Sequence, residues 1–479
     1  MNLFVMLAFP LLAALLCWRA RTPGIASGAT LASCIAVLVL AIDTAFAALR
    51  GGTVVGVEIA VAADALSALM LLLIAVVATG AAFFSRGYMQ RMREGPARLW
   101  FYYLNFNLFV FSMLAVPLLV EPTLVWIFVE LTTLCSAMLV GYENTREALE
   151  AAWKYVALSL MGAAIGLLGF LVLFAAMQAA GGGTYTWEGL VQAAPRMPPA
   201  LIETAFLLVL VGFGTKVGLV PLHTWLPDAH SQAPSPVCAV LSGVETTVIL
   251  YVILRMLPVL DAVPGVDLQL WTVSFGLLSV GVAAFLLIQV RDYKRMFAYS
   301  TVEHMGIILV AAGLGSAAAN YSTVYQALTH TLTKSFCFYA AGAALLATGS
   351  RDILAQRGLI RRSPATGASL LIGGLAIAGA PPFAVFLSEF SIFRAGLAEG
   401  RYIAIGLLVL FIAIGFFAVM RHVNRMVFGA AAGAAEPFRL PASCAAVLVV
   451  AAALVIVSGL YLPPPLHELL QRAAARMAG

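Results

Sequence analysis

The segment GLVPLHTWLPD, residues 218–228, interrupts an apolar run, and the segment GAPPFAVFLSE, residues 379–389, aligns on it without gaps. Gly, Pro, an aromatic residue, Leu and an acidic residue recur at the same offsets. Proline at Pro221, and at Pro381 and Pro382, breaks an otherwise apolar helix and frees backbone carbonyls. Such breaks are tolerated in a membrane only against protein or a wet cavity, and paired breaks indicate a transport site. The alternative is a chance similarity between two membrane segments rich in Gly and Pro.

The composition around these segments excludes a soluble protein. Of the 479 residues, 62% are hydrophobic and 10% are charged, whereas a soluble domain has about 25% charged residues. Apolar runs long enough to cross the hydrocarbon core follow one another with short polar breaks. We therefore expect an all-α polytopic membrane protein of about 14 transmembrane helices. The predicted runs lie near 3–18, 25–48, 61–84, 100–120, 122–141, 150–179, 201–220, 234–257, 267–290, 293–315, 321–347, 368–396, 401–428 and 440–462.

Other sequence features predict the first helix, the longest loop, the lack of a metal site and the orientation of the chain. The first run lacks a basic region before it and is interpreted as a spanning helix, not a signal peptide. The longest polar insert, residues 181–199, is predicted to be a surface loop. The six cysteines form no C-x-x-C pair, so we expect no metal site and no cofactor in this chain. Most Lys and Arg residues follow odd-numbered runs, which predicts both termini on the non-cytoplasmic side.

Several ionisable residues fall inside the apolar runs, where each costs about 2.5–3.5 kcal/mol at the bilayer centre. Such residues are rare and usually functional. Two of the four lysines of the chain are among them. The candidates for proton transfer are Glu130, Lys216, Glu245, His330, Lys334 and Glu389, and the candidates for entry or support are His223, Glu303 and His304.

The spacing of these residues suits proton transfer. His330 and Lys334 are four residues apart and share one helix face, so a proton can pass between them. Burial and pairing act in opposite directions on the proton affinity of a lysine. A Glu130–Lys216 pair would therefore be tunable, and opening or closing it would release or hold a proton.

Each candidate also has a purely structural interpretation. Lys216 could be only a partner for an acid, and Glu245 could be a group that hydrogen-bonds two helices together. His223, beside the first break, could satisfy freed carbonyls. Glu303 and His304 follow the basic stretch RDYKR and could lie near the cytoplasmic interface, where ionisation costs little.

The motifs around these residues are similar to those of a known family. The sequence resembles the antiporter-like subunits shared by respiratory complex I, multi-subunit cation/proton antiporters and membrane-bound nickel–iron hydrogenases, and it looks most like the hydrogenase-4 type F component. The matching phrases are FVELTTLCSAMLVGY, GFGTKVGLVPLHTWLPDAHSQAPSPVCAVLSG, RDYKRMFAYSTVEHMGI, ALTHTLTKSFCFYAAG and GAPPFAVFLSEF.

The resemblance implies a fold of fourteen helices with two inverted five-helix repeats and broken seventh and twelfth helices. The implied divisions are residues 1–99 for helices 1–3, 100–260 for the first repeat, 261–430 for the second repeat, and 431–479 for helix 14 and the tail.

The resemblance also assigns roles to individual residues. Glu130 matches the glutamate of the family's fifth helix and Lys216 the lysine of its seventh helix. His330 matches the histidine of the eleventh helix, and Glu389 matches the terminal acid or lysine of the twelfth. One position departs: the eighth-helix lysine common in the family falls on Thr247, and Glu245 stands two residues earlier. A relay would then depend on Glu245 and water.

These features predict a proton-translocating subunit of a redox-driven complex, most similar to a membrane-bound hydrogenase, that does no redox chemistry itself. Its expected partners are other membrane subunits and, through them, a peripheral redox arm, in a bacterial inner membrane and without nucleic acid. Open alternatives are an NADH–quinone oxidoreductase, an antiporter or an inorganic-carbon uptake complex as the assembly, a structural anchor with a decayed path, or a haem- or quinone-binding subunit. A lysine path without a carboxylate cage favours H⁺ over Na⁺.

Overall fold

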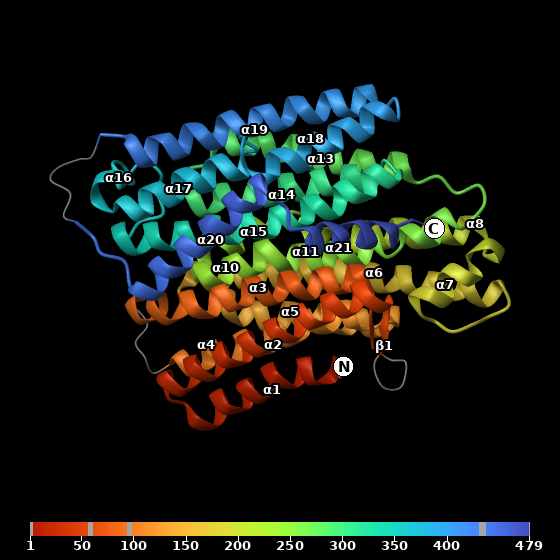
Figure 1. The fold of residues 1–479 in the computed structure, drawn as a ribbon, viewed down its shortest axis with the longest axis horizontal. Coiled ribbons are helices and arrows are strands. Elements are labelled where there is room, and N and C mark those ends of the chain that lie inside the picture. The colour runs from red at the N-terminus through yellow and green to blue at the C-terminus, as the bar shows by residue number, and fades with distance from the viewer. Residues whose placement is uncertain (1–2, 56–60, 93–97, 431–436, 479) are drawn as a thin grey trace.

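The computed structural model describes residues 3–55, 61–92, 98–430 and 437–478, and it is a bundle of long, roughly parallel helices (Figure 1). The predicted domain ends at residues 1, 431 and 479 lie outside the described residues. The helices before the first break are α1 (Leu3–Ala20), α2 (Pro23–Gly51), α3 (Ala65–Tyr88), α4 (Leu99–Leu118), α5 (Pro122–Val140), α6 (Arg146–Ala179), α7 (Trp187–Ala193) and α8 (Pro199–Val217). Between the two breaks lie α9 (Trp225–Gln232), α10 (Ser235–Val240), a π-helical turn (Leu241–Glu245), α11 (Thr246–Leu254), α12 (Leu257–Asp261), α13 (Gln269–Gln289), α14 (Tyr293–Ala312), α15 (Ala317–Thr348), α16 (Leu359–Arg362) and α17 (Pro364–Ile377). The last helices are α18 (Ala384–Ala398), α19 (Tyr402–Phe428), α20 (Ala442–Leu460) and α21 (Pro464–Ala475).

Most of the predicted spans are found as long apolar helices. Within the described residues, eleven helices are long and apolar enough to cross a membrane. Three further predicted runs correspond to α14, α15 and the broken pair α17 and α18. The ionisable residues of α14 and α15 lower the hydropathy of these helices, and the second break divides the remaining run into two short helices. The chain is thus an all-α polytopic membrane protein, with one small exception: β1 (Val54–Val55) pairs antiparallel with β2 (Ala62–Ala63).

The two helix breaks have the same backbone geometry. Gly218 follows α8 with φ 89°, and Gly379 follows α17 with φ 73°. The peptide bonds Val220–Pro221 and Pro381–Pro382 are both cis. Because a positive φ favours glycine, the glycine that recurs in the aligned segments has one backbone role in both. The alignment of residues 218–228 on 379–389 therefore describes a repeated structure, while the number of helices in each repeat stays a prediction.

Glycines let the helices next to the breaks approach closely. A Cβ on Gly162 of α6 would lie 2.6 Å from the Gly212 carbonyl oxygen of α8. A Cβ on Gly276 of α13 would likewise lie 2.7 Å from the Gly306 carbonyl oxygen of α14. Small residues at crossings are the usual means of packing helices in lipid. Two helices that carry candidate residues, α8 and α14, are thus packed closely against the neighbouring backbones of α6 and α13.

Two surface segments are more ordered than the sequence suggests. The insert 181–199, predicted to be a loop, contains α7, which begins at the side-chain cap Thr186 and buries Trp187 and Leu190. The tail contains α21, which packs against α3 and α15. Figure 1 places the start of α1 and the end of α21 toward the same side of the bundle.

Candidate functional site

The first break leaves backbone groups that need partners, and nearby groups supply them. The Leu219 amide donates to the Gly214 carbonyl at 2.8 Å. The Thr215 carbonyl accepts from the Trp225 indole Nε1 of α9 at 2.8 Å. These bonds fix the last turn of α8, and that turn carries Lys216.

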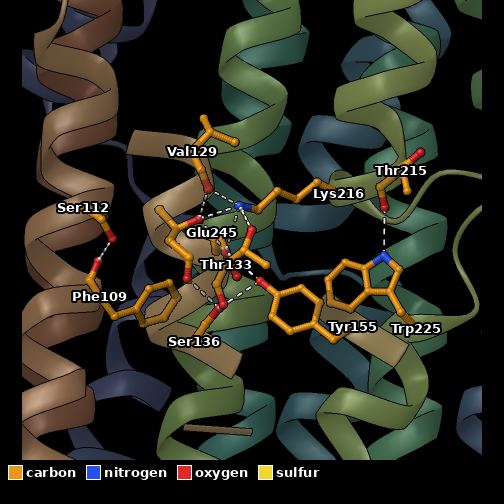
Figure 2. Close-up of polar contacts among 11 residues, drawn as sticks. Phe109, Ser112, Val129, Thr133, Ser136, Tyr155, Thr215, Lys216, Trp225 and Glu245 are labelled. Atoms are coloured by element: carbon orange, nitrogen blue, oxygen red, sulfur yellow. Dashed lines mark hydrogen bonds and ion pairs between the residues drawn. The ribbon is translucent and has the colours of Figure 1, made fainter. Parts of the chain in front are cut away.

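Lys216 is buried between α8, α5 and the π-helical turn (Figure 2). Its Nζ donates to the Thr132 hydroxyl at 2.7 Å, and also to the Val129 carbonyl and the Thr133 hydroxyl. The Glu245 carboxylate lies 3.9 Å from Nζ. The three N–H bonds of the ammonium group therefore all have acceptors within the protein.

Glu245 is held from two other helices. Its Oε1 accepts from the Thr132 hydroxyl of α5 at 2.8 Å and from the Tyr155 hydroxyl of α6 at 3.1 Å. Because Thr132 also accepts from Lys216, one hydroxyl joins the cation and the anion. A hydroxyl is both donor and acceptor, so Lys216, Thr132 and Glu245 form a continuous hydrogen-bonded chain.

The expected Glu130–Lys216 pair is replaced by a different one. The ion pair that the structure forms joins Lys216 to Glu245. In the part of the chain that the structure describes, neither carboxylate oxygen of Glu130 has a hydrogen-bond partner. The physical reason is the side of α5 that faces α8: Val129, Thr132 and Thr133 present their oxygens to the lysine. Glu130 stays a nearby acid without a fixed partner.

The departure at Thr247 also has a structural explanation. The Thr247 hydroxyl donates to the Gly243 carbonyl of its own helix at 3.3 Å. Residues two apart on a helix point in different directions, so Glu245 does not occupy the direction of the family's lysine. It faces α5, α6 and α8 instead.

The π-helical turn connects Glu245 to the second half of the chain. The His330 Nε2 of α15 donates to the Ser242 carbonyl at 3.1 Å, and the Thr246 hydroxyl donates to the same carbonyl at 2.8 Å. Single π turns frequently mark functional positions in helices. Here one turn carries the acid on one side and supplies an acceptor to a histidine on the other.

His330 and Lys334 lie on one face of α15, as predicted, and bond to different neighbours. The Lys334 Nζ donates to the Phe297 carbonyl of α14 at 2.8 Å and to the Ser300 hydroxyl. The His330 ring centre lies 5.3 Å from that of His304. His304 in turn donates from Nε2 to the Ile377 carbonyl at 2.9 Å. Both histidines are thus buried between α14, α15 and the second break.

A hydroxyl and amide chain leads from His304 toward Glu389. The Gln326 Nε2 lies 3.2 Å from the His304 Nδ1, and the Ser388 hydroxyl donates to the Gln326 Oε1. Ser388 is the residue before Glu389 on α18. Glu389 is buried, with 4% of its surface exposed, and its carboxyl group packs against Gly379 of the second break.

Glu303 and His223 occupy different surroundings. Glu303 is buried on α14, and its carboxyl group packs against Gly415 of α19. It therefore does not lie at an interface with water, the position that its sequence neighbours suggested. His223 lies in the first break, and within the described residues its Nδ1 has no partner.

Three groups at or near the site were not predicted from the sequence. Thr132 and Tyr155 carry no charge and gave no signal of their own. Lys294, placed in a basic loop by its neighbours, is buried and donates to the Ser231 carbonyl at 3.2 Å. Within the described residues no three His, Cys, Asp or Glu side chains gather into a group that could hold a metal.

A second buried ion pair lies at another end of the bundle. Arg255 binds Asp64 in bidentate fashion, with Nη–Oδ distances of 2.6 and 2.7 Å. Burial raises the pKa of Asp64, but the Arg255 charge and the hydrogen bonds from Arg255 and the Ser67 amide together lower that pKa to about 2. The pair lines a cavity of about 470 Å³ together with Tyr251, Trp187 and Arg476.

Known families match most of this chain. A family model described as NADH:quinone oxidoreductase/Mrp antiporter, transmembrane, matches residues 121–416. A second, described as NADH-ubiquinone oxidoreductase (complex I), chain 5 N-terminus, matches residues 52–99. The two matches include the first and second helix breaks and every candidate residue.

Individual proteins match over nearly the whole length. The hydrogenase-4 component F homolog of Methylacidiphilum infernorum (isolate V4) is 37% identical over 423 residues, which are 86% of this chain and 87% of that protein. A chain of the membrane-bound sulfane sulfur reductase, an archaeal respiratory membrane complex, has a TM-score of 0.90 and 25% identity, covering 99% of this chain and 97% of that one. A chain of the Mrp complex from Dietzia sp. DQ12-45-1b has the same TM-score and coverage at 21% identity and so shows the fold alone.

Proposed function

This chain belongs to the NADH:quinone oxidoreductase/Mrp antiporter family of transmembrane subunits, and on that premise we propose that it translocates protons in a redox-driven membrane complex. One observation carries the proposal: a buried lysine, Lys216, is joined to a buried acid, Glu245, through the hydroxyl of Thr132. Ionisable residues at such depth are costly and usually functional.

The first half of the path consists of Lys216, Thr132 and Glu245. When the Lys216 ammonium gives a proton to the Thr132 oxygen, that hydroxyl gives its own proton to Glu245. The result is a neutral lysine and a neutral acid, so neither group is left as an uncompensated charge inside the bundle. Glu130, which lies beside Lys216 without a fixed partner, is proposed to favour the charged lysine and so to bias this transfer.

The second half is proposed to run through α14, α15 and the second break. His330 bonds to the turn that carries Glu245, and Lys334 lies one helical turn further along α15. Glu389, next to Ser388 in the chain that leads to His304, is proposed as the exit-side acid. Glu303, His304 and His223 are proposed as supporting groups.

The driving partner is proposed from the relatives. The 37% identical homolog is named for hydrogenase-4, so we place this chain beside other membrane subunits and a hydrogenase arm, without a cofactor of its own. An NADH–quinone or Mrp-type assembly is the alternative, favoured by the family description. We propose a bacterial inner membrane with both termini on the non-cytoplasmic side, and residues 100–260 and 261–430 as the two repeats.

Proton uptake in vesicles tests the proposal. The whole complex would be reconstituted with Lys216→Ala or Glu130→Ala, and proton movement measured at a fixed rate of electron transfer. We expect a loss of at least tenfold for Lys216→Ala and a smaller loss for Glu130→Ala. Lys154→Ala is the control, because this lysine lies at the surface and pairs with Glu150 and Asp228. Undiminished proton uptake in Lys216→Ala would refute the proposal.

A further inference from the structure

Tyr155 connects the buried ion pair to the segment beyond the first break. It is fully buried on α6, and its hydroxyl lies between the Ser136 hydroxyl, at 2.8 Å, and the Glu245 Oε1, at 3.1 Å. Its ring stacks on Trp225 of α9, with ring centres 4.4 Å apart and an interplanar angle of 29°. One side chain therefore contacts both the acid and the helix that follows the break (Figure 2).

Trp225 holds Lys216 in place through a hydrogen bond to the backbone of the preceding residue. Its indole Nε1 donates to the Thr215 carbonyl at 2.8 Å, and Thr215 directly precedes Lys216. The Leu219 amide, the usual partner of this carbonyl in a helix, bonds to Gly214 instead, so the carbonyl accepts from the indole and from the Gly218 amide at 3.2 Å. Trp225 thus fixes the turn of α8 from which the lysine projects.

We propose that Tyr155 and Trp225 are positioning residues that set the separation of Lys216 and Glu245, and that they make this separation depend on where α9 lies. Tyr155 fixes the carboxylate, Trp225 fixes the lysine's turn, and the ring stack joins the two. The observed separation of 3.9 Å leaves the Thr132 hydroxyl as the bridge. The inference rests on the proposed function and deepens it. It makes proton transfer from Lys216 to Glu245 depend on the position of α9, the helix beyond the first break.

Two variants remove the polar contacts and keep the rings. Tyr155→Phe loses the donor to Glu245 and keeps an aromatic ring against Trp225. Trp225→Phe loses the donor to Thr215 and keeps a ring against Tyr155. Each would be measured in the reconstituted complex for proton translocation against pH, and for carbodiimide labelling of Glu245 by mass spectrometry, a reaction that requires the protonated acid.

We expect translocation to fall about five- to tenfold in Tyr155→Phe. Because the ionised carboxylate loses a donor, half-maximal translocation moves to a higher pH and carbodiimide labelling of Glu245 increases. A loss of general stability would lower the rate equally at every pH and leave the labelling unchanged. For Trp225→Phe we expect a smaller loss of rate with the same change in the pH profile.

Matched controls are present in the chain. Tyr102→Phe removes a buried tyrosine hydroxyl that bonds to Ser85 at 2.8 Å, remote from the pair. Trp126→Phe removes an indole that donates to the Ala163 carbonyl at 2.9 Å. Both should keep the wild-type pH profile. If Tyr155→Phe matches Tyr102→Phe in pH profile and in labelling, the positioning role is wrong while the proposed function stands. If Lys216→Ala also pumps normally, both fail.

Discussion

Removing one partner of the buried pair should cost more than removing both. In Lys216→Met, Glu245 keeps its donors Thr132 and Tyr155 but loses its cation, which leaves an uncompensated buried charge. Breaking a buried pair costs about 3–5 kcal/mol, whereas replacing both partners costs far less. We therefore expect Lys216→Met/Glu245→Gln to be more stable than Lys216→Met, measured by thermal unfolding in detergent. Equal stability of the two variants would show that Glu245 without its lysine is not an uncompensated buried charge.

The Asp64–Arg255 pair makes a prediction for acid stability. The pKa of Asp64 is lowered to about 2 in the folded protein, against about 3.9 for a free aspartate. A lowered folded pKa means that the stabilisation, about 2 kcal/mol, is present at neutral pH and is lost as pH falls from 4 toward 2. Asp64→Asn should lower the unfolding temperature at pH 7 and flatten its decline in acid. An unchanged slope below pH 4 would contradict the assignment.

At the scale of elements, the close crossing of α6 and α8 should tolerate no side chain. A Cβ on Gly212 would lie 2.7 Å from the Gly162 carbonyl oxygen, in addition to contacts with the Gly166 backbone. Overpacking of this kind costs about 1–3 kcal/mol. Gly212→Ala should therefore lower the unfolding temperature and reduce translocation, because α8 carries Lys216.

The control for this substitution is Gly406→Ala on α19. A Cβ at Gly406 meets nothing within 4 Å, and alanine favours a helix over glycine by about 0.5–1 kcal/mol. This variant should be as stable as the wild type or more so. A drop equal to that of Gly212→Ala would mean that any glycine substitution in these helices is harmful, and the packing argument would be lost.

For the whole molecule, the sidedness can be tested with single cysteines. The six native cysteines are buried, so an engineered surface cysteine gives a clean signal. Glu188 is exposed on α7, at the right-hand side of Figure 1. Arg291 is also exposed. Its carbonyl accepts from the Ile353 amide at 2.8 Å, so it lies beside the segment that leads into α16, at the opposite end of the bundle in Figure 1. In intact cells, an impermeant maleimide should label Glu188→Cys and spare Arg291→Cys. The reverse labelling pattern would show that the proposed orientation is wrong.

The sequence alone determined the class of fold, the two breaks and the set of ionisable residues. Lipid offers no hydrogen bonds to the backbone, so apolar runs of about 20 residues satisfy their own backbone groups as helices, and glycine is the residue that best suits the positive φ of Gly218 and Gly379. The length of α7 and the burial of Lys294 escaped this reasoning because their neighbours in sequence are polar, although both segments pack against distant helices.

The tertiary structure alone decided which groups meet. Lys216 pairs with Glu245 and not with Glu130, because the rotation of α5 presents Thr132 and Thr133 to the lysine. Asp64 and Arg255 pair although 191 residues separate them. Helix rotation and contacts between remote segments follow from packing over the whole bundle, and no local pattern of residues encodes them.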